Sequence, residues 1–249
     1  MDCGGKNARM FIALQRGNVL FIVLVAIVLI GALLYAAMPS MRHSLKEAGE
    51  GTSISSGAMM QYTASLRAAV AGLLYKGAMV SELEFNRPGH FESCSRVEFC
   101  VFHPEGGGIS YTPVGRDAMS SSDLTNDWGF SALFEVEGVG VSIEGDFAGN
   151  DVLALVYGVS ETVCKQMNQD LGVFDVPVSE IEDTVFTGVL AQGLDPSIAG
   201  SGGMESGWEA MDGEEVIGRG ETAVLAGQAQ GCFKSKAGHN VYYSVLLER

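Results

Sequence analysis

Five cysteines and four histidines are the side chains of this sequence best suited to metal binding or nucleophilic catalysis. Cys94, Cys100 and His103 lie close together along the chain, but their spacing fits no common zinc module. No serine lies in a Gly-x-Ser-x-Gly segment, and the stretch 200–203 (GSGG) lacks the strand and helix of a nucleophile elbow. We therefore predict no catalytic residue, no metal ligand and no cofactor, and we expect that the protein is not an enzyme.

Two acid-rich stretches, residues 123–127 and 146–151, carry enough oxygen atoms to bind calcium. Neither has the spacing of an EF-hand loop. We interpret both as solvated turns.

The cysteines indicate disulfides rather than metal. Four cysteines follow the apolar stretch 19–38, namely Cys94, Cys100, Cys164 and Cys232, whereas Cys3 precedes it. Four cysteines allow three pairings, of which we favour Cys94–Cys100 with Cys164–Cys232. In the chain-entropy model these loops would stabilise the fold by about 2.4 and about 4.4 kcal/mol. Neither favoured pair has CxxC spacing, which argues against a redox-active dithiol.

An apolar stretch near the amino terminus limits the function most sharply. Residues 19–38 contain no charge and no Asn or Gln, and as a helix they would be roughly 30 Å long. That length matches the hydrocarbon core of a bilayer. The stretch is longer than the apolar part of a secretory signal peptide and lacks a small-x-small cleavage site. We predict a retained transmembrane helix with membrane lipid around it.

The distribution of charge predicts the orientation. Lys6, Arg9 and Arg16 precede the apolar stretch, and basic residues beside a first span tend to stay in the cytoplasm. The whole chain holds 15 Lys and Arg against 30 Asp and Glu, so the part after the span is strongly acidic. We expect this acidic part outside the cytoplasm. Its charge also argues against nucleic acid as a partner, since phosphate contacts need Lys and Arg.

Hydrophobic periodicity predicts an α+β domain after the span. Five apolar residues from Met59 to Leu73 recur at spacings of three and four, which indicates a core-facing amphipathic helix from about Ser56. A second helix at 161–170 has Ser160 as its N-cap and Gly172 as its stop. The expected strands are 97–102 with 109–112 as a hairpin, 130–136 with 139–143, 152–159, 185–190, and a terminal hairpin of 231–234 with 240–247. Residues 191–231, rich in Gly and Ser, are expected to be a long surface excursion.

The start of the chain resembles a type IV pilin or pseudopilin precursor. Arg16-Gly17 matches the end of the family's basic leader, and Asn18 would be the first residue after cleavage by prepilin peptidase. Pro39 falls where pilins commonly have a helix-bending proline. Ile22 stands where most pilins have a Glu, a departure that some minor pseudopilins share. The resemblance covers about residues 15–40.

The resemblance implies a structural subunit of a type IV pilus or a type II secretion-like filament in the bacterial inner membrane. Its partners would be other pilin-like subunits and prepilin peptidase, and Gly17 and Asn18 would be the processing residues. The implied division is a cytoplasmic leader at 1–17, a transmembrane helix at 18–38, a linker at 39–55 and a periplasmic or extracellular α+β domain at 56–249. The alternative is an uncleaved, membrane-anchored periplasmic binding or envelope protein without a filament.

Overall fold

The computed structural model describes residues 23, 25–29, 50–140, 151–186 and 215–249. The chain divides into two units, Met1–Glu47 and Ala48–Arg249. In the first unit, residues 23 and 25–29 are helical and exposed. Among the residues described, no helix has both the length and the apolar character needed to cross a membrane. The expected leader at 1–17 and most of the expected span at 18–38 lie outside the described residues.

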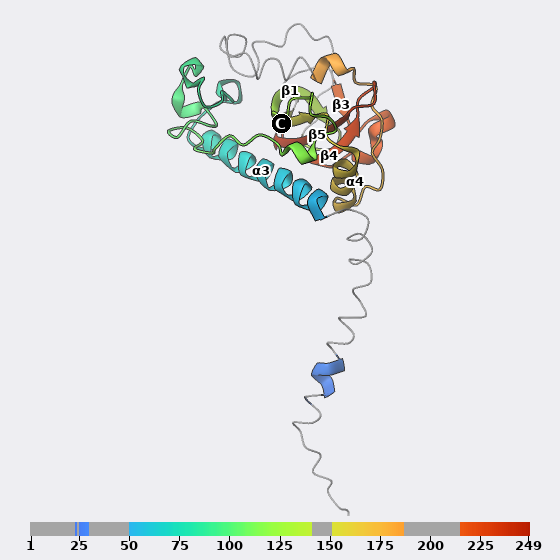
Figure 1. Cartoon of the computed structure of the whole chain (residues 1–249). Coiled ribbons are helices and arrows are strands. Elements are labelled where there is room, and N and C mark those ends of the chain that lie inside the picture. The colour runs from blue at the N-terminus through green and yellow to red at the C-terminus, as the bar shows by residue number, and fades with distance from the viewer. Residues whose placement is uncertain (1–22, 24, 30–49, 141–150, 187–214) are drawn as a thin grey trace, which may run out of the picture. The chain divides into compact units, whose positions relative to one another are not determined.

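A mostly antiparallel sheet forms the centre of the second unit (Figure 1). Five strands are described, in the order β3-β1-β2-β5-β4. β3 runs parallel to β1, and the other neighbouring pairs are antiparallel. The strands are β1 (Gly129–Val136), β2 (Asp151–Tyr157), β3 (Glu215–Ile217), β4 (Gln230–Lys234) and β5 (Asn240–Leu247). The predicted α+β class and the terminal hairpin, formed by β4 and β5, are confirmed.

The two central strands are buried on both faces. Every residue of β2 is buried, as is every residue of β5 except its last. Side chains alternate between the faces of a strand, so a strand covered on both sides reads as an unbroken apolar run. This explains why β2 and β5 were recognisable from the sequence.

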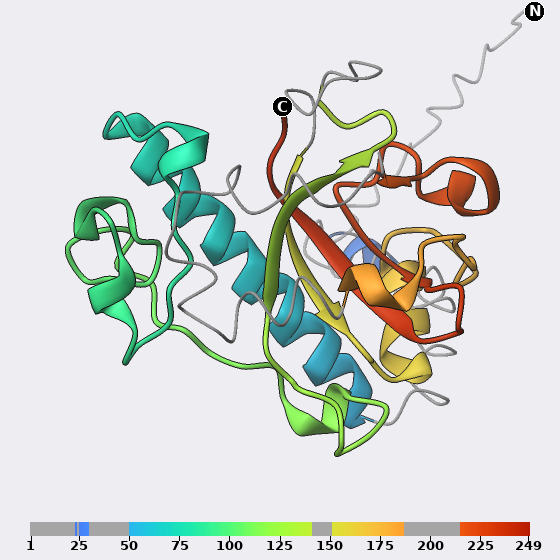
Figure 2. The same ribbon diagram turned by 90° about the horizontal axis from the view of Figure 1, so that it is seen from above.

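Helix α3 (Glu50–Tyr75) covers one face of the sheet (Figure 2). Leu66, Val70 and Leu73 of the predicted stripe are completely buried, which confirms its inward face. The helix begins at Glu50, earlier than expected, so the last part of the segment assigned to a linker is helical. Ser55, in the first turns of the helix, is buried, and its hydroxyl contacts both the carbonyl oxygen of Gly51 and the carboxylate of Asp117, far along the chain.

Helix α4 (Glu161–Asp170) packs against the same face of the sheet as α3. The Ser160 hydroxyl accepts a hydrogen bond from the backbone of Val163, and Gly172 has a φ of 80°, so both predicted helix ends are confirmed. Cys164 of this helix forms a disulfide with Cys232 of β4. The bond ties the helix to the edge of the sheet.

The opposite face of the sheet is covered by irregular segments. Val173, Ile181 and Phe186 pack there together with the 3-10 helix η6 (Gly220–Leu225). The expected strand at 185–190 is wrong in its described part, since residues 183–186 are helical and the Phe186 ring packs 5.8 Å from that of Phe134. The surface excursion expected at 191–231 is likewise wrong from residue 215 onward, because β3 and η6 contribute fully buried side chains.

Two predicted strand pairings are also wrong. Val97–Phe99 forms a 3-10 turn instead of a strand, and the backbone then coils so that the amide of Gly107 donates to the carbonyl oxygen of Cys100 at 3.0 Å. A side chain at Gly106 would collide with that same carbonyl oxygen, so glycine is required for the coil. Strand β1 pairs with β2 and β3 rather than with 139–143, of which residues 141–143 lie outside the described part.

The outer edge of β4 is satisfied by side-chain and loop contacts. Asn168, which is completely buried, donates to the carbonyl oxygens of Cys232 at 2.9 Å and Asp175 at 2.6 Å, and it accepts from the Cys232 amide at 2.9 Å. Farther along the edge, the Lys234 amide donates to Pro177 at 2.7 Å. Exposed strand edges invite pairing with other chains. Asn168 therefore acts in place of a neighbouring strand.

We expect Asn168→Asp to destabilise the protein by at least about 3 kcal/mol at pH 7, because a carboxylate oxygen would replace the buried amide group that donates to the carbonyl oxygens of Cys232 and Asp175. The loss should shrink at acidic pH, where the carboxyl group is protonated and donates again. Urea unfolding followed by circular dichroism measures it. Gln169→Glu, the same change at the exposed neighbouring position, should alter stability by no more than about 0.5 kcal/mol. Equal effects of the two substitutions would contradict this role of Asn168.

Candidate functional site

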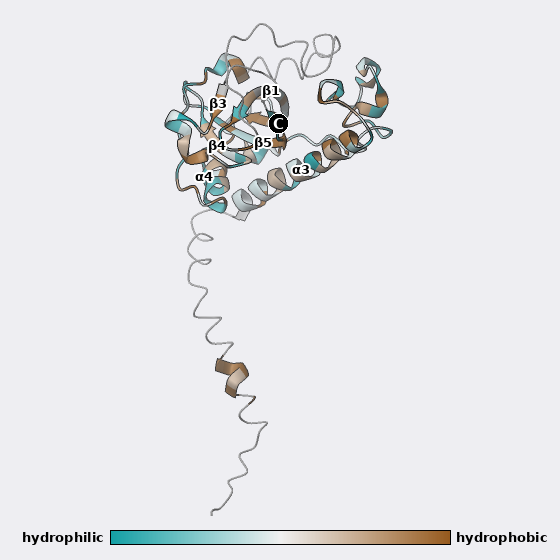
Figure 3. Cartoon of the chain, turned by 180° about the vertical axis from the view of Figure 1, so that it is seen from behind, coloured by the Kyte–Doolittle hydropathy of each residue, from teal (hydrophilic) through white to brown (hydrophobic). Residues whose placement is uncertain are grey.

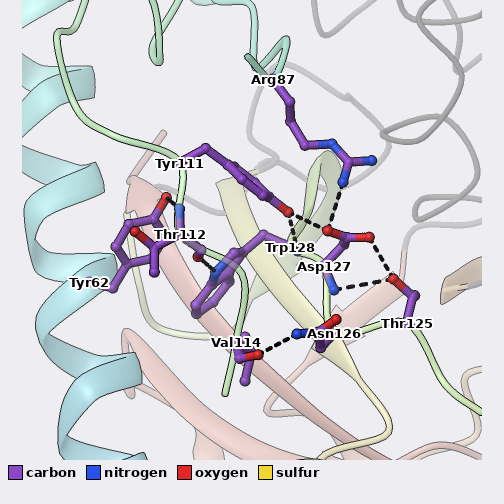
Figure 4. Close-up of polar contacts among 9 residues, drawn as sticks. All are labelled: Tyr62, Arg87, Tyr111, Thr112, Val114, Thr125, Asn126, Asp127 and Trp128. Carbon is purple, nitrogen blue, oxygen red and sulfur yellow. Dashed lines mark hydrogen bonds and ion pairs between the residues drawn. The ribbon is translucent and has the colours of Figure 1, made fainter. Parts of the chain in front are cut away.

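A cluster of polar and aromatic side chains joins α3 to the loop that precedes β1 (Figure 4). Its centre is Asp127, whose Oδ1 accepts from the Tyr111 hydroxyl at 2.8 Å and pairs with Arg87 at 2.7 Å. The other oxygen, Oδ2, accepts from the Thr125 hydroxyl at 2.7 Å. The guanidinium carbon of Arg87 lies 5.3 Å from the centre of the Tyr111 ring. Both oxygens of Asp127 are thus engaged by protein donors.

An aromatic pair continues this cluster onto α3. The ring of Tyr62, on α3, lies 5.3 Å from that of the buried Trp128. The backbone of Thr112 accepts from the Trp128 indole at 3.0 Å and donates to the Tyr62 hydroxyl at 3.1 Å. Beside them, the side-chain amide of Asn126 donates from Nδ2 to the carbonyl oxygen of Val114 at 2.6 Å. These contacts hold residues 111–128 against the helix without a regular strand.

Burial and hydrogen bonding act on the titration of this cluster in opposite directions. Burial disfavours the charged form of Asp127, but donors from Thr125 and Tyr111 and the charge of Arg87 outweigh it and hold the pKa of Asp127 below its usual range. Burial, followed by the bond to Asp127, raises the pKa of Tyr111. At neutral pH the cluster therefore contains a carboxylate, a guanidinium and a neutral phenol.

A groove of about 200 Å³ lies next to the aromatic pair. Its walls are mostly apolar and include Ala58, Tyr62, Pro113 and Trp128. Ile54 at its rim is 71 % exposed. The groove has the character of an apolar contact surface with a few polar atoms.

The acidic stretch 123–127 is a solvated turn only in part, since Asp123 is exposed and lies in a turn whereas Asp127 is half-buried. Asp127 is held by Arg87, Tyr111 and Thr125, and the arginine occupies the position that a cation would need beside Oδ1. The second acid-rich stretch, 146–151, lies outside the described residues except for Asp151. The chemistry of the Asp127 cluster is that of a fixed ion pair, with no side chain poised as a nucleophile.

Asp151 anchors the carboxyl terminus. It is completely buried and accepts from the backbone amides of Val136 at 3.0 Å and Arg249 at 3.1 Å. Burial raises the pKa of Asp151 to about 6, with a contribution from the negative charges of Glu135 and Glu248, although the two amide donors oppose the shift. The carboxyl group therefore acts as a structural acceptor at the end of the sheet.

A second titratable cluster lies around the terminal hairpin. Oδ2 of Asp183 accepts from the Tyr157 hydroxyl at 2.8 Å and lies 2.7 Å from Nδ1 of His239. The rings of Tyr157 and His239 are 5.0 Å apart. Ser235 is buried, accepts from the backbone amide of His239 at 3.1 Å and forms a side-chain hydrogen bond with Asp183.

The structure brings the four later cysteines together in the favoured pairing, Cys94–Cys100 and Cys164–Cys232. The proposed processing residues Gly17 and Asn18 lie outside the described residues. Sequence reasoning missed Arg87, Tyr111 and Glu84, which meet their partners only through the fold. Arg87 stands in the turn-type segment 86–89 (NRPG), and no local pattern marks Tyr111 or Glu84. Glu84 lies against the disulfide Cys94–Cys100, with its Oε2 3.5 Å from Sγ of Cys100.

Comparison with known proteins gives no match: no family model, curated protein or solved structure is significantly similar to this chain.

We expect Asp127→Asn to cost about 2 kcal/mol of stability at pH 7, because it removes a carboxylate that accepts charge-assisted hydrogen bonds. When a carboxyl group has a lower pKa in the folded than in the unfolded protein, it stabilises the fold at pH values above the unfolded pKa. This stabilisation is lost as the pH falls through the folded pKa. The deficit should therefore begin to shrink below about pH 4 and fall further as the pH approaches the lower folded pKa of Asp127. Urea unfolding across pH 3–7 measures it. Asp123→Asn, at an exposed position of the same loop, serves as control, and a deficit that does not change with pH would contradict the assignment.

Proposed function

We propose that this protein is a single-pass membrane protein and a structural subunit of a pilin-like filament, with its acidic domain outside the cytoplasm. The observation that carries the proposal is the order of parts. A basic leader ending in Arg16-Gly17 precedes the apolar stretch 19–38, and a long helix packed on a mostly antiparallel sheet follows. In this reading the apolar stretch anchors the subunit and then packs with its neighbours.

The attachment of α3 to the sheet supports the proposal. Helix α3 is held to the sheet by buried side chains and by specific polar bonds. The hydroxyls of Thr63 and Tyr242 share a hydrogen bond of 3.1 Å, and Nε of Arg67 donates to the carbonyl oxygen of Val245 at 2.8 Å. A helix fixed in this way would transmit a load from its amino-terminal end into the sheet rather than peel away from it.

The outer face of α3 favours packing against other subunits. Glu50 and Arg67 are the only charged residues in the helix, in a chain with a net charge of −15. Figure 3 shows pale and brown ribbon along most of α3, with little teal. Small side chains let helices approach closely, and missing charges remove a barrier to burial. We define the outer face by its exposed residues Gly57, Gln61, Ala64, Ala68, Ala71 and Gly72.

Processing of the amino terminus tests the proposal directly. Protein purified from its native membrane should begin at Asn18, with a methylated amine, when analysed by intact mass and amino-terminal sequencing. Substitution of Gly17 should leave residues 1–17 attached and should block entry into filaments, because the peptidase would no longer cut before Asn18. Sheared filaments and membranes are compared by immunoblot.

A native chain that still carries residues 1–17 would overturn the filament proposal. It would favour the alternative, an uncleaved anchored binding or envelope protein. The apolar groove beside Tyr62 and Trp128 would then be the first surface to test for a ligand.

Ala68→Glu should abolish recovery in the filament fraction, because it places a charge in the middle of the outer face of α3. Its effect on folding should stay within about 0.5 kcal/mol, since Ala68 is exposed. Ala237→Glu, at an exposed position of the terminal hairpin loop, is the matched control and should assemble normally. Normal assembly of both variants would exclude the outer face of α3 from subunit contacts.

A further inference from the structure

The carboxylate of Glu84 lies beside the disulfide Cys94–Cys100, a contact that no local sequence pattern indicates. One ligand atom from each of Glu84, Cys94 and Cys100 lies within 4.8 Å of the other two. The backbone amide of Ser95 donates to both oxygens of Glu84, at 3.0 and 2.9 Å. These bonds fix the carboxylate against the sulfur atoms instead of letting it turn into solvent.

A buried amide completes the arrangement. Asn86 is 7 % exposed, and its Nδ2 lies 3.5 Å from Oε2 of Glu84 and 3.5 Å from Sγ of Cys94. One donor is therefore shared between the carboxylate and a sulfur atom. Outer groups of this kind orient the ligands in metal sites.

The carboxylate of Glu84 has no cationic partner within the described part of the chain. Arg96, two residues after Cys94, pairs instead with Glu82 and with Glu98. A neutral disulfide does not compensate the negative charge of a carboxylate held beside it. A bound cation would compensate that charge.

The spacing suits a tetrahedral cation. Zinc bonds of about 2.3 Å to sulfur and about 2.0 Å to carboxylate oxygen place sulfur and oxygen about 3.5 Å apart at tetrahedral angles. Oε2 of Glu84 and Sγ of Cys100 already lie 3.5 Å apart. Two thiolates on one zinc would need about 3.8 Å between their sulfurs. Once the disulfide is opened, side-chain rotation within the short loop can supply that separation.

We propose that reduction of Cys94–Cys100 creates a site for Zn²⁺, formed by the two thiolates and the Glu84 carboxylate, with water in the fourth position. A dithiol reductant supplies the two electrons and two protons that convert the disulfide to two thiols, and is itself oxidised to a disulfide. Zinc then displaces the two thiol protons, which pass to solvent. This site goes beyond the filament proposal and does not depend on it.

The accessibility of its sulfur atoms favours reduction of Cys94–Cys100 over reduction of Cys164–Cys232. Cys94 is partly exposed, whereas Cys164 and Cys232 are completely buried between α4 and β4. Thiol–disulfide exchange requires the attacking thiolate to reach a sulfur atom. Mild reduction of the folded protein therefore opens Cys94–Cys100 first.

The test uses the full chain in detergent with Cys3→Ser, mildly reduced and titrated with Co²⁺ as the probe. One equivalent should bind with a thiolate-to-cobalt charge-transfer band, and Zn²⁺ should displace it. Glu84→Gln should weaken binding at least about tenfold, because it removes a charged ligand. Glu92→Gln, at an exposed position of the same segment, should not change the affinity.

Absence of cobalt binding by the reduced protein would overturn the proposal, as would unchanged affinity in Glu84→Gln. Binding that persists when Cys94 and Cys100 are both replaced by Ser would assign the metal to other thiols and also overturn it. If a variant misfolds, the site can still be tested in protein that keeps Glu84, Cys94 and Cys100. Zn²⁺ should slow alkylation of Cys94 and Cys100 by iodoacetamide, read by mass spectrometry, and unchanged alkylation would count against the site.

Discussion

Burial of both faces of the β2–β5 pair is the constraint on which the rest of this domain depends. Every side chain of β2 faces a covered surface, so the sheet needs material on both sides to keep these residues from water. Helices α3 and α4 supply one cover, and the segment 173–186 with η6 supplies the other. The two covers differ in kind, because one is helical and regular whereas the other is irregular and is held by aromatic side chains such as Phe186.

Polar side chains complete the domain wherever regular structure ends. Asn168 satisfies the edge of β4, Asp127 holds the loop before β1 against α3, and Asp151 holds the last residue of the chain. In each case the side-chain oxygen of the Asn or Asp accepts hydrogen bonds from donors that have no partner on a neighbouring strand. Such groups contribute little while intact and are costly to lose, since removal of one partner leaves the other without a hydrogen bond in a dry environment.

The two proposals concern different surfaces. The filament proposal depends on the apolar stretch 19–38 and on the uncharged outer face of α3, where helix packing would be favourable. The metal proposal depends on Glu84, Asn86 and the disulfide Cys94–Cys100, a compact polar group whose carboxylate has no cationic partner among the described residues. The acidic character of the chain is compatible with both, since it keeps the remaining surface soluble and attracts cations.

The sequence by itself determined the elements whose signal is local. The stripe from Met59 to Leu73, the Ser160 cap and the terminal hairpin were predicted because periodicity and capping depend on neighbouring residues. The α+β class followed from these elements. Tertiary structure decided the rest. The first turns of α3 contact Asp117 through Ser55, the coil at 100–107 depends on glycines that pack against backbone, and β1 pairs with β2 and β3 instead of a hairpin partner. Glu84 and Arg87 acquired their partners in the same way, because contacts between residues distant in sequence leave no periodic trace in it.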